Sequence, residues 1–318
     1  MQRDTYIDSI KTILIFTVVL THGLVRLGSG SVDEYIVMNF LYTSNMPLFV
    51  FVSGLLFNTS KSWAKVLLGG AELLVTYSLF QIIWMILNHT PMEASNFLLP
   101  QFSLWYLLSL FSWRIILKCV SCITDNKYVW FIGAVIISLC CGFIPLGKMM
   151  SFQRTFSFLP FFVMGLLCRG TSVLDNIRAV DKRITIGIVF FLVIVTFYIG
   201  KPPYWLLCGR TSYYVYPCNL VLAPVVKLCW YFIAFVVSAC FLNLFLDKEQ
   251  FAKHGSKTLT VYLLHYFPIW ILRNWGCRTD SLLLLTCLSF AIFVVLIYID
   301  RFYIVKLLTN PLSLCRRK

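Results

Sequence analysis

Long apolar stretches alternate with short polar connections along the whole chain. A helix that crosses a bilayer needs about 20 mostly apolar residues, because its backbone polar groups must bond within the helix. Many of the apolar stretches have this length, and the alternating pattern of barrel strands is absent. We therefore expect an all-α, polytopic integral membrane protein with about ten transmembrane helices. The predicted spans are 10–28, 36–57, 66–88, 102–122, 128–147, 155–169, 184–200, 219–246, 258–275 and 281–308.

The composition supports a membrane protein. Of the 318 residues, 59% are hydrophobic and only 13% are charged, and the mean hydropathy is +0.83. Soluble domains carry about a quarter charged residues, so a water-soluble enzyme, a disordered regulator and a nucleic-acid-binding module are excluded. Membrane lipid is the expected partner. No linker, repeat or soluble domain interrupts the pattern, so we expect one transmembrane domain over 1–318.

The charges predict an orientation. The net charge is +14, and 19 of the 27 Lys and Arg residues lie in connections on the side of the N-terminus, against 7 on the opposite side. Basic connections stay in the cytoplasm, so we expect both termini there and an even number of spans. The first apolar run follows Asp4 and Asp8 and has no small-residue cleavage site, so we interpret it as a retained helix.

The 12 cysteines form no metal-binding pattern, because Cys119 and Cys122 make a lone C-x-x-C without a second pair or a histidine set. We therefore expect no metal. Cys208 and Cys218 share one connection on the outer side, and whether they are bridged is left open at this stage.

Lys11 and His22 stand out in the first span. Eleven helical residues leave a rotation of only about 20° and a rise of about 16 Å, so both side chains project from one face. Lys11 then reaches the cytoplasmic interface while His22 lies deep, and Asp8 can pair with Lys11. Two interpretations are open: an interfacial anchor with a hydrogen-bonding histidine, or a functional pair in which His22 is a general base.

Further ionisable residues fall within predicted spans, at Glu72, Lys227 and His265. Such residues are costly in lipid, and they mark either a functional site or a paired structural contact. Trp105 is typical of a packing or interface residue.

Five short sequence motifs, called strings below, resemble those of a known protein family when they are taken in order. They are RDTYIDSIKTILIFTVVLTHG (3–23), SNMPLFVFVSGLLF (44–57), LWYLLSLF (104–111), RTFSFLPFFVMGLL (154–167) and HGSKTLTVYLLHYF (254–267). Together they resemble the acyltransferase-3 family of membrane acyltransferases. The fourth and fifth are most similar to the fucose 4-O-acetylase-like branch.

The resemblance implies a ten-helix enzyme of the bacterial inner membrane. Such an enzyme moves an acyl group, here an acetyl group from cytoplasmic acetyl-CoA, to a hydroxyl of a cell-surface or lipid-linked glycan. The resemblance also assigns essential first-span roles to Lys11 and His22, and it therefore favours the functional interpretation of His22.

A mechanism follows as a hypothesis. A neutral His22 would remove the proton of a sugar hydroxyl as it attacks the thioester carbonyl. The CoA phosphates would bind the cationic residues Lys11, Lys61 and Lys65. The expected substrate-binding residues are Asn45, Arg154, Arg210 and Lys227, and the expected supporting residues are Asp8, Glu72, Trp105 and His265. For Arg154 and Arg210, ordinary loop charge is the alternative.

The chain departs from the family pattern at several positions. Asn45 replaces a usual histidine, Gly69 and Glu72 stand where arginine is expected, and Lys227 stands where arginine is frequent. Two rival functions therefore stay open: a proton-coupled membrane transporter and an acyltransferase-like protein without catalytic activity.

Overall fold

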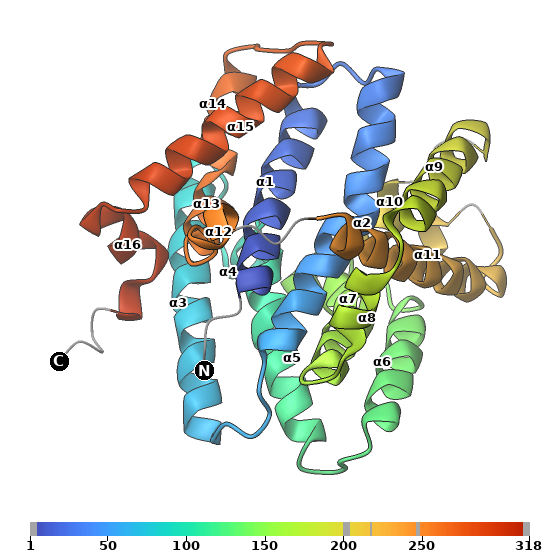
Figure 1. The fold of residues 1–318 in the computed structure, drawn as a ribbon. Helices are drawn as coiled ribbons and strands as arrows, with labels where there is room; N and C mark the ends of the chain where they lie inside the picture. The colour runs from blue at the N-terminus through green and yellow to red at the C-terminus, as the bar shows by residue number, and fades with distance from the viewer. Residues whose placement is uncertain (1–4, 200–203, 217, 246–248, 314–318) are drawn as a thin grey trace. The chain divides into compact units, whose positions relative to one another are not determined.

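The protein is described here from a computed structural model, which covers residues 5–199, 204–216, 218–245 and 249–313. Within these ranges every element of secondary structure is a helix (Figure 1), which confirms the all-α class. Six helices in the described ranges have the length and apolar composition to cross a membrane. They are α1 (Thr5–Leu27), α2 (Val32–Leu56), α3 (Trp63–Leu87), the stretch Met149–Cys168 that contains α7 (Phe152–Cys168), α11 (Leu222–Leu244) and α15 (Leu282–Ile299).

The other four predicted spans correspond to helices that are not among these six. They are α5 (Trp105–Val120), α6 (Lys127–Cys141), α9 (Lys182–Ile199) and the pair α13 (Thr258–Leu264) and α14 (Tyr266–Asn274). The count of about ten spans stays a prediction. The cytoplasmic placement of the termini also stays a prediction, and residues 1–4 and 314–318 lie outside the described ranges.

Two of the predicted spans differ most clearly from the helices in extent. The span 281–308 was too long, because α15 ends at Ile299 and a separate helix, α16 (Tyr303–Thr309), follows. The span 258–275 is divided at His265. Pro268 explains the division, because proline has no N–H to donate to the carbonyl of Leu264 and its ring crowds that carbonyl.

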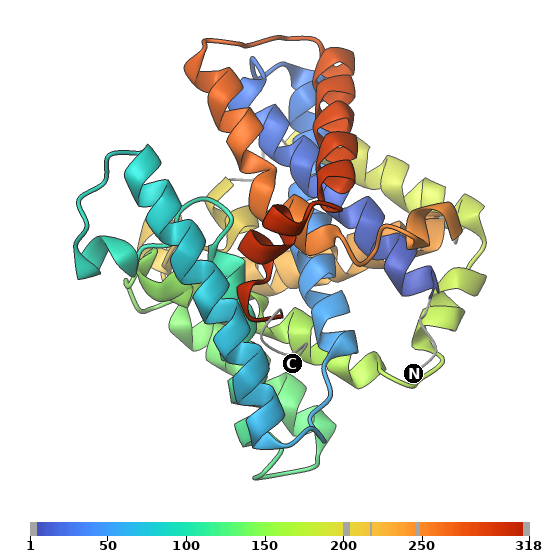
Figure 2. The same cartoon turned by 90° about the vertical axis from the view of Figure 1, so that its left-hand side faces the viewer.

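The chain forms two compact units, and the boundary between them runs through α2 and α11. The first unit comprises 1–49, 172–203 and 233–309. Within it, α1 packs against α15, α14, α13 and the short α12 (Glu249–Ala252). Figure 2 shows α14 and α15 as a hairpin beside α1. Gly23 lets α1 and α15 approach closely, because a Cβ there would lie 2.7 Å from Ser289 Oγ.

The second unit comprises 50–171, 204–232 and 310–318. Its helices pack in the order α3, α5, α7 and α6. The last turns of α2 cross α7 at two glycines: a Cβ at Gly54 would overlap the carbonyl of Phe162, and a Cβ at Gly165 would overlap that of Phe51. Small residues permit this backbone contact between apolar helices.

The cysteines of the second unit answer the question left open by the sequence. No disulfide joins Cys208, at the end of α10 (Tyr204–Cys208), to Cys218.

Candidate functional site

His22 and His265 lie together in the first unit. The centroids of their rings are 5.0 Å apart, and the His22 ring lies 5.5 Å from that of Tyr266 in an edge-on arrangement. His22 is partly exposed on α1, whereas His265 is fully buried at the division between α13 and α14. A partly exposed histidine therefore lies against a buried one.

The local backbone determines which nitrogen of His265 carries the proton. Its Nδ1 lies 2.8 Å from the carbonyl oxygen of Tyr262 and 3.1 Å from that of Val261. A carbonyl only accepts hydrogen bonds, so Nδ1 is the donor and the neutral ring keeps its lone pair on Nε2. That buried Nε2 has no hydrogen-bond partner among the described residues.

Asn45 connects α2 to α1 within the same unit. Its Nδ2 donates to Thr21 Oγ1 at 2.9 Å, and its Oδ1 accepts from Thr17 Oγ1 at 2.9 Å. The side chain is almost fully buried. Both the oxygen and the nitrogen of the amide are therefore hydrogen-bonded to α1. One of the two partners, Thr21, is the residue next to His22.

The other first-span residues lie near the start of α1. Lys11 Nζ is 2.6 Å from Asp8 Oδ1. Asp8 is buried against Gly255, where a Cβ would lie 2.6 Å from that of Asp8. Lys11 is only partly exposed, so the ion pair is shielded from solvent.

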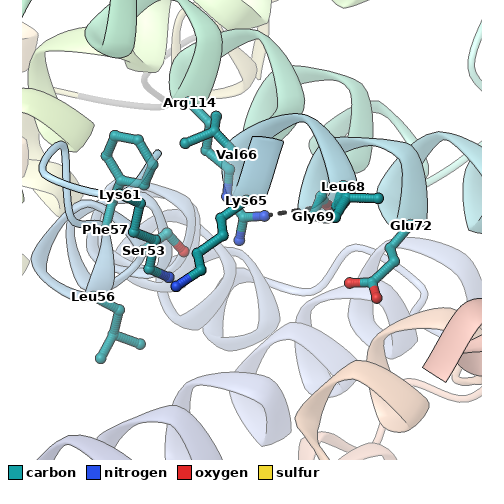
Figure 3. Close-up of a pocket in the computed structure, with 10 residues that line it drawn as sticks. All are labelled: Ser53, Leu56, Phe57, Lys61, Lys65, Val66, Leu68, Gly69, Glu72 and Arg114. Carbon is teal, nitrogen blue, oxygen red and sulfur yellow. Dashed lines mark hydrogen bonds between the residues drawn. The ribbon is translucent and has the colours of Figure 1, made fainter. Parts of the chain in front are cut away.

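A cavity of about 570 Å³ lies in the second unit (Figure 3), within the usual range for ligand pockets. Its lining combines predicted site residues with apolar ones: Ser53, Leu56, Phe57, Lys61, Lys65, Val66, Leu68, Gly69, Glu72 and Arg114. Figure 3 shows Lys61, Lys65 and Arg114 gathered at one part of the cavity and the Glu72 carboxylate apart from them. Three cations against one carboxylate make this cavity electropositive.

The connection between α2 and α3 forms one wall of this cavity. Arg169 Nη1 donates to the carbonyl of Phe57 at 2.8 Å, and Lys118 Nζ donates to that of Thr59 at 2.8 Å. The Ser53 hydroxyl bonds to that of Tyr106 on α5. These bonds brace the segment that carries Lys61.

Sequence reasoning did not select Arg114 as a site residue and counted it among the loop charges. It lies within α5, more than a turn before the end of that helix. An ionisable residue inside an apolar helix was the signal that could have found it.

The remaining predicted residues lie elsewhere in the second unit. The Arg154 guanidinium lies 4.7 Å above the Trp105 ring, and Arg154 Nε donates to the carbonyl of Cys208 at 3.3 Å. Trp105 is buried, and Arg210 is partly exposed.

Lys227 is 4% exposed, and its Nζ donates to the carbonyl of Ser138 at 2.9 Å. The rings of Tyr213 and Tyr231 lie 5.7 Å and 6.0 Å from the ammonium. The proposed roles of Lys227, Arg154 and Arg210 in substrate binding stay predictions.

The five strings divide between the two units. Residues of the first, second and fifth meet around His22, through His265 and Asn45. The end of the second string contacts the third and fourth, as in the bonds from Ser53 to Tyr106 and from Ser109 to Thr155. Among the described residues, no group of three or more His, Cys, Asp or Glu could hold a metal ion.

Comparison with known proteins identifies the family of the chain. Residues 4–301 match the family described as Acyl_transf_3, acyltransferase domain. No curated protein and no solved structure matches the chain. Because the match covers nearly the whole sequence, the chain belongs to the acyltransferase-3 family of membrane acyltransferases.

Proposed function

We propose that this protein is an O-acyltransferase that moves an acetyl group from acetyl-CoA to a hydroxyl of a cell-surface or lipid-linked glycan. His22 is the general base. The observation that best supports this proposal is the contact of the partly exposed His22 with the buried His265. The fucose 4-O-acetylase-like branch, to which two strings are similar, supports a sugar hydroxyl as the acceptor.

The chemical step uses His22 in its neutral form. Its imidazole takes the proton of the hydroxyl while the hydroxyl oxygen bonds to the thioester carbonyl carbon. The carbon–sulfur bond then breaks, and the proton passes to the departing CoA thiolate. A positioned base contributes about 10²- to 10⁴-fold to such a reaction.

His265 is a positioning residue in this proposal. Its Nδ1–H is held by backbone carbonyls, so its Nε2 can only accept a hydrogen bond. An acceptor at a fixed place orients a neighbouring donor group, as the partners of metal-bound histidines do. The Tyr266 ring lies against that of His22, and Asn45 bonds to the neighbouring residue, Thr21.

The donor binds through its phosphates. Lys61 and Lys65 line an electropositive cavity, which supports their role in holding CoA. Lys11, paired with Asp8, keeps its predicted role in the first span. Arg154 and Arg210 bind the glycan, with Trp105 supporting Arg154.

The proposed topology has ten crossings: the six candidate helices together with α5, α6, α9 and the α13–α14 pair. This count is even, so both termini lie on the same side of the membrane, and the basic connections indicate that this side is the cytoplasm. The proposed location is the bacterial inner membrane.

The deciding experiment incubates membranes containing the protein with labelled acetyl-CoA and candidate glycans, and measures label on the glycan by mass spectrometry. His22→Ala should be inserted normally and lose at least about a hundredfold in transfer rate. His89→Asn is the matched control, because His89 is an exposed histidine with φ of 51°, a conformation that asparagine tolerates.

Other outcomes identify the rival functions. Near wild-type transfer by His22→Ala would remove the base assignment. Proton-driven flux without transfer would indicate a transporter. The absence of both activities in the wild-type protein would indicate an acyltransferase-like protein without catalysis.

A further inference from the structure

Arg114 reaches from α5 to the backbone of α3 at the electropositive cavity. Its Nη1 lies 3.5 Å from the carbonyl oxygen of Gly69, the limit of a hydrogen bond. A guanidinium has five N–H donors. This long bond is the only hydrogen bond of the Arg114 guanidinium to the described residues, so most of its donors are available to a ligand.

Gly69 makes room for this guanidinium. A Cβ at position 69 would lie 3.6 Å from Arg114 Nη1, in van der Waals contact. A longer side chain would occupy the place that Arg114 takes. Gly69 on α3 therefore leaves the space that the long side chain of Arg114 on α5 occupies.

The neighbouring charges indicate the kind of ligand. Lys61 and Lys65 line the same cavity on the side of Arg114 (Figure 3), and Glu72, which also attracts the Arg114 guanidinium, leaves a surplus of two positive charges. Like charges gathered at one place repel one another unless an anion lies among them. A planar guanidinium beside two ammonium groups fits a phosphate, which it binds through two parallel hydrogen bonds.

We infer that Arg114 is a binding residue for a phosphate group of the acyl donor, and that it places its guanidinium in the cavity over Gly69. This inference rests on the proposed function, because it takes CoA as the donor. Lysine at position 114 would keep the charge but lose the paired hydrogen bonds.

The test measures binding of CoA to the purified full-length protein in phosphatidylcholine nanodiscs by calorimetry. Arg114→Leu should raise the dissociation constant by about tenfold to a hundredfold, which corresponds to the loss of a charge-assisted hydrogen bond. Arg114→Lys should give an intermediate value. Pantetheine, which has no phosphate, should bind weakly and equally to all variants.

A second substitution distinguishes a local charge effect from misfolding. Gly69→Arg in the Arg114→Leu protein returns a guanidinium to the same place from the other helix, and it should restore most of the affinity. Lys127→Gln is the control for total charge, because Lys127 is exposed at the start of α6 and does not line the cavity. Its dissociation constant should be unchanged.

The outcomes separate this inference from the proposed function. If Arg114→Leu binds CoA as tightly as the wild type while acetyl transfer persists, the inference is wrong and the function stands. If CoA binding depends on Arg114 but no glycan is acetylated, the inference stands and the function fails. A further measurement compares the melting temperature of each protein with and without added phosphatidylglycerol. If Arg114→Leu binds CoA normally but loses the rise in melting temperature that this lipid gives, the phosphate belongs to a lipid. The assignment of the phosphate to the donor is then overturned.

Discussion

The rings of His22 and His265 lie 5.0 Å apart, although the two residues come from opposite ends of the chain. His265 Nδ1 donates to two carbonyls of its own helix, and Nε2 is buried without a hydrogen-bond partner among the described residues. A buried acceptor of this kind costs free energy unless something uses it. The helix is divided at His265, so this division places the buried Nε2 beside His22, the proposed general base.

His265→Asn tests this connection, because an asparagine amide can still donate to the Tyr262 carbonyl but provides nothing at the place of Nε2. We expect the turnover number to fall by about tenfold to a hundredfold, with little change in the Michaelis constants for donor and acceptor. Steady-state kinetics on the variant in nanodiscs would measure both. An unchanged turnover number would show that His265 only packs.

Asn45 provides a second prediction, at the contact of α1 with α2. Asn45→Leu should lower the free energy of unfolding by roughly 1 to 2 kcal/mol, because it removes bonds to Thr17 and Thr21. Thermal unfolding in detergent, followed by tryptophan fluorescence, would measure the change.

The threonines decide whether Asn45 does more than hold the helices together. Thr17→Val with Thr21→Val removes the same partners and leaves the amide in place. Equal losses of stability and of activity in both variants would mean a structural role alone. A larger loss of activity in Asn45→Leu would support contact with the substrate.

The crossing of α2 and α7 gives a third prediction. Gly54→Ala and Gly165→Ala should each destabilise the protein by about 1 to 3 kcal/mol, because the new methyl group meets a backbone carbonyl that cannot move aside. Gly133→Ala on α6 is the control. A Cβ added at Gly133 would meet no neighbouring atom within 4 Å. The higher helix propensity of alanine should therefore stabilise this variant by up to about 1 kcal/mol.

Melting temperatures of these three variants test the close approach. If Gly54→Ala and Gly165→Ala melt like the wild type, the two helices do not approach as closely as the structure indicates.

The fourth prediction concerns pH and His254, which lies between α12 and α13. Burial, and then the charges of Lys257 and Lys253, hold the pKa of His254 below its ordinary value of 6.5. The unfolded chain therefore binds this proton more readily than the folded protein does. Stability contributed by neutral His254 is complete above about pH 7 and is lost as the pH falls from 6.5 through the lowered pKa.

Melting temperatures at pH 7.5 and pH 5.5 would test this sign. The wild-type protein should lose more stability on acidification than His254→Gln, which has no group to titrate at that position. An equal loss in both proteins would show that His254 does not contribute to the pH dependence.

The sequence by itself determined the class of the protein and most of its helices. Backbone groups in lipid must be satisfied within a helix, so apolar runs of sufficient length are read directly as helices. The spacing of Lys11 and His22 and the order of the five strings are also local properties. They indicated the family without knowledge of any contact between helices.

Only the tertiary structure decided which side chains meet. In a membrane the surface that faces lipid is as apolar as the surface that faces other helices, so hydropathy does not reveal the packed face. α15 has the highest mean hydropathy of the six candidate spans and the smallest buried share. The contacts of His22 with His265, and of Arg114 with Gly69, depend on how helices pack against one another, and no local pattern contains that information.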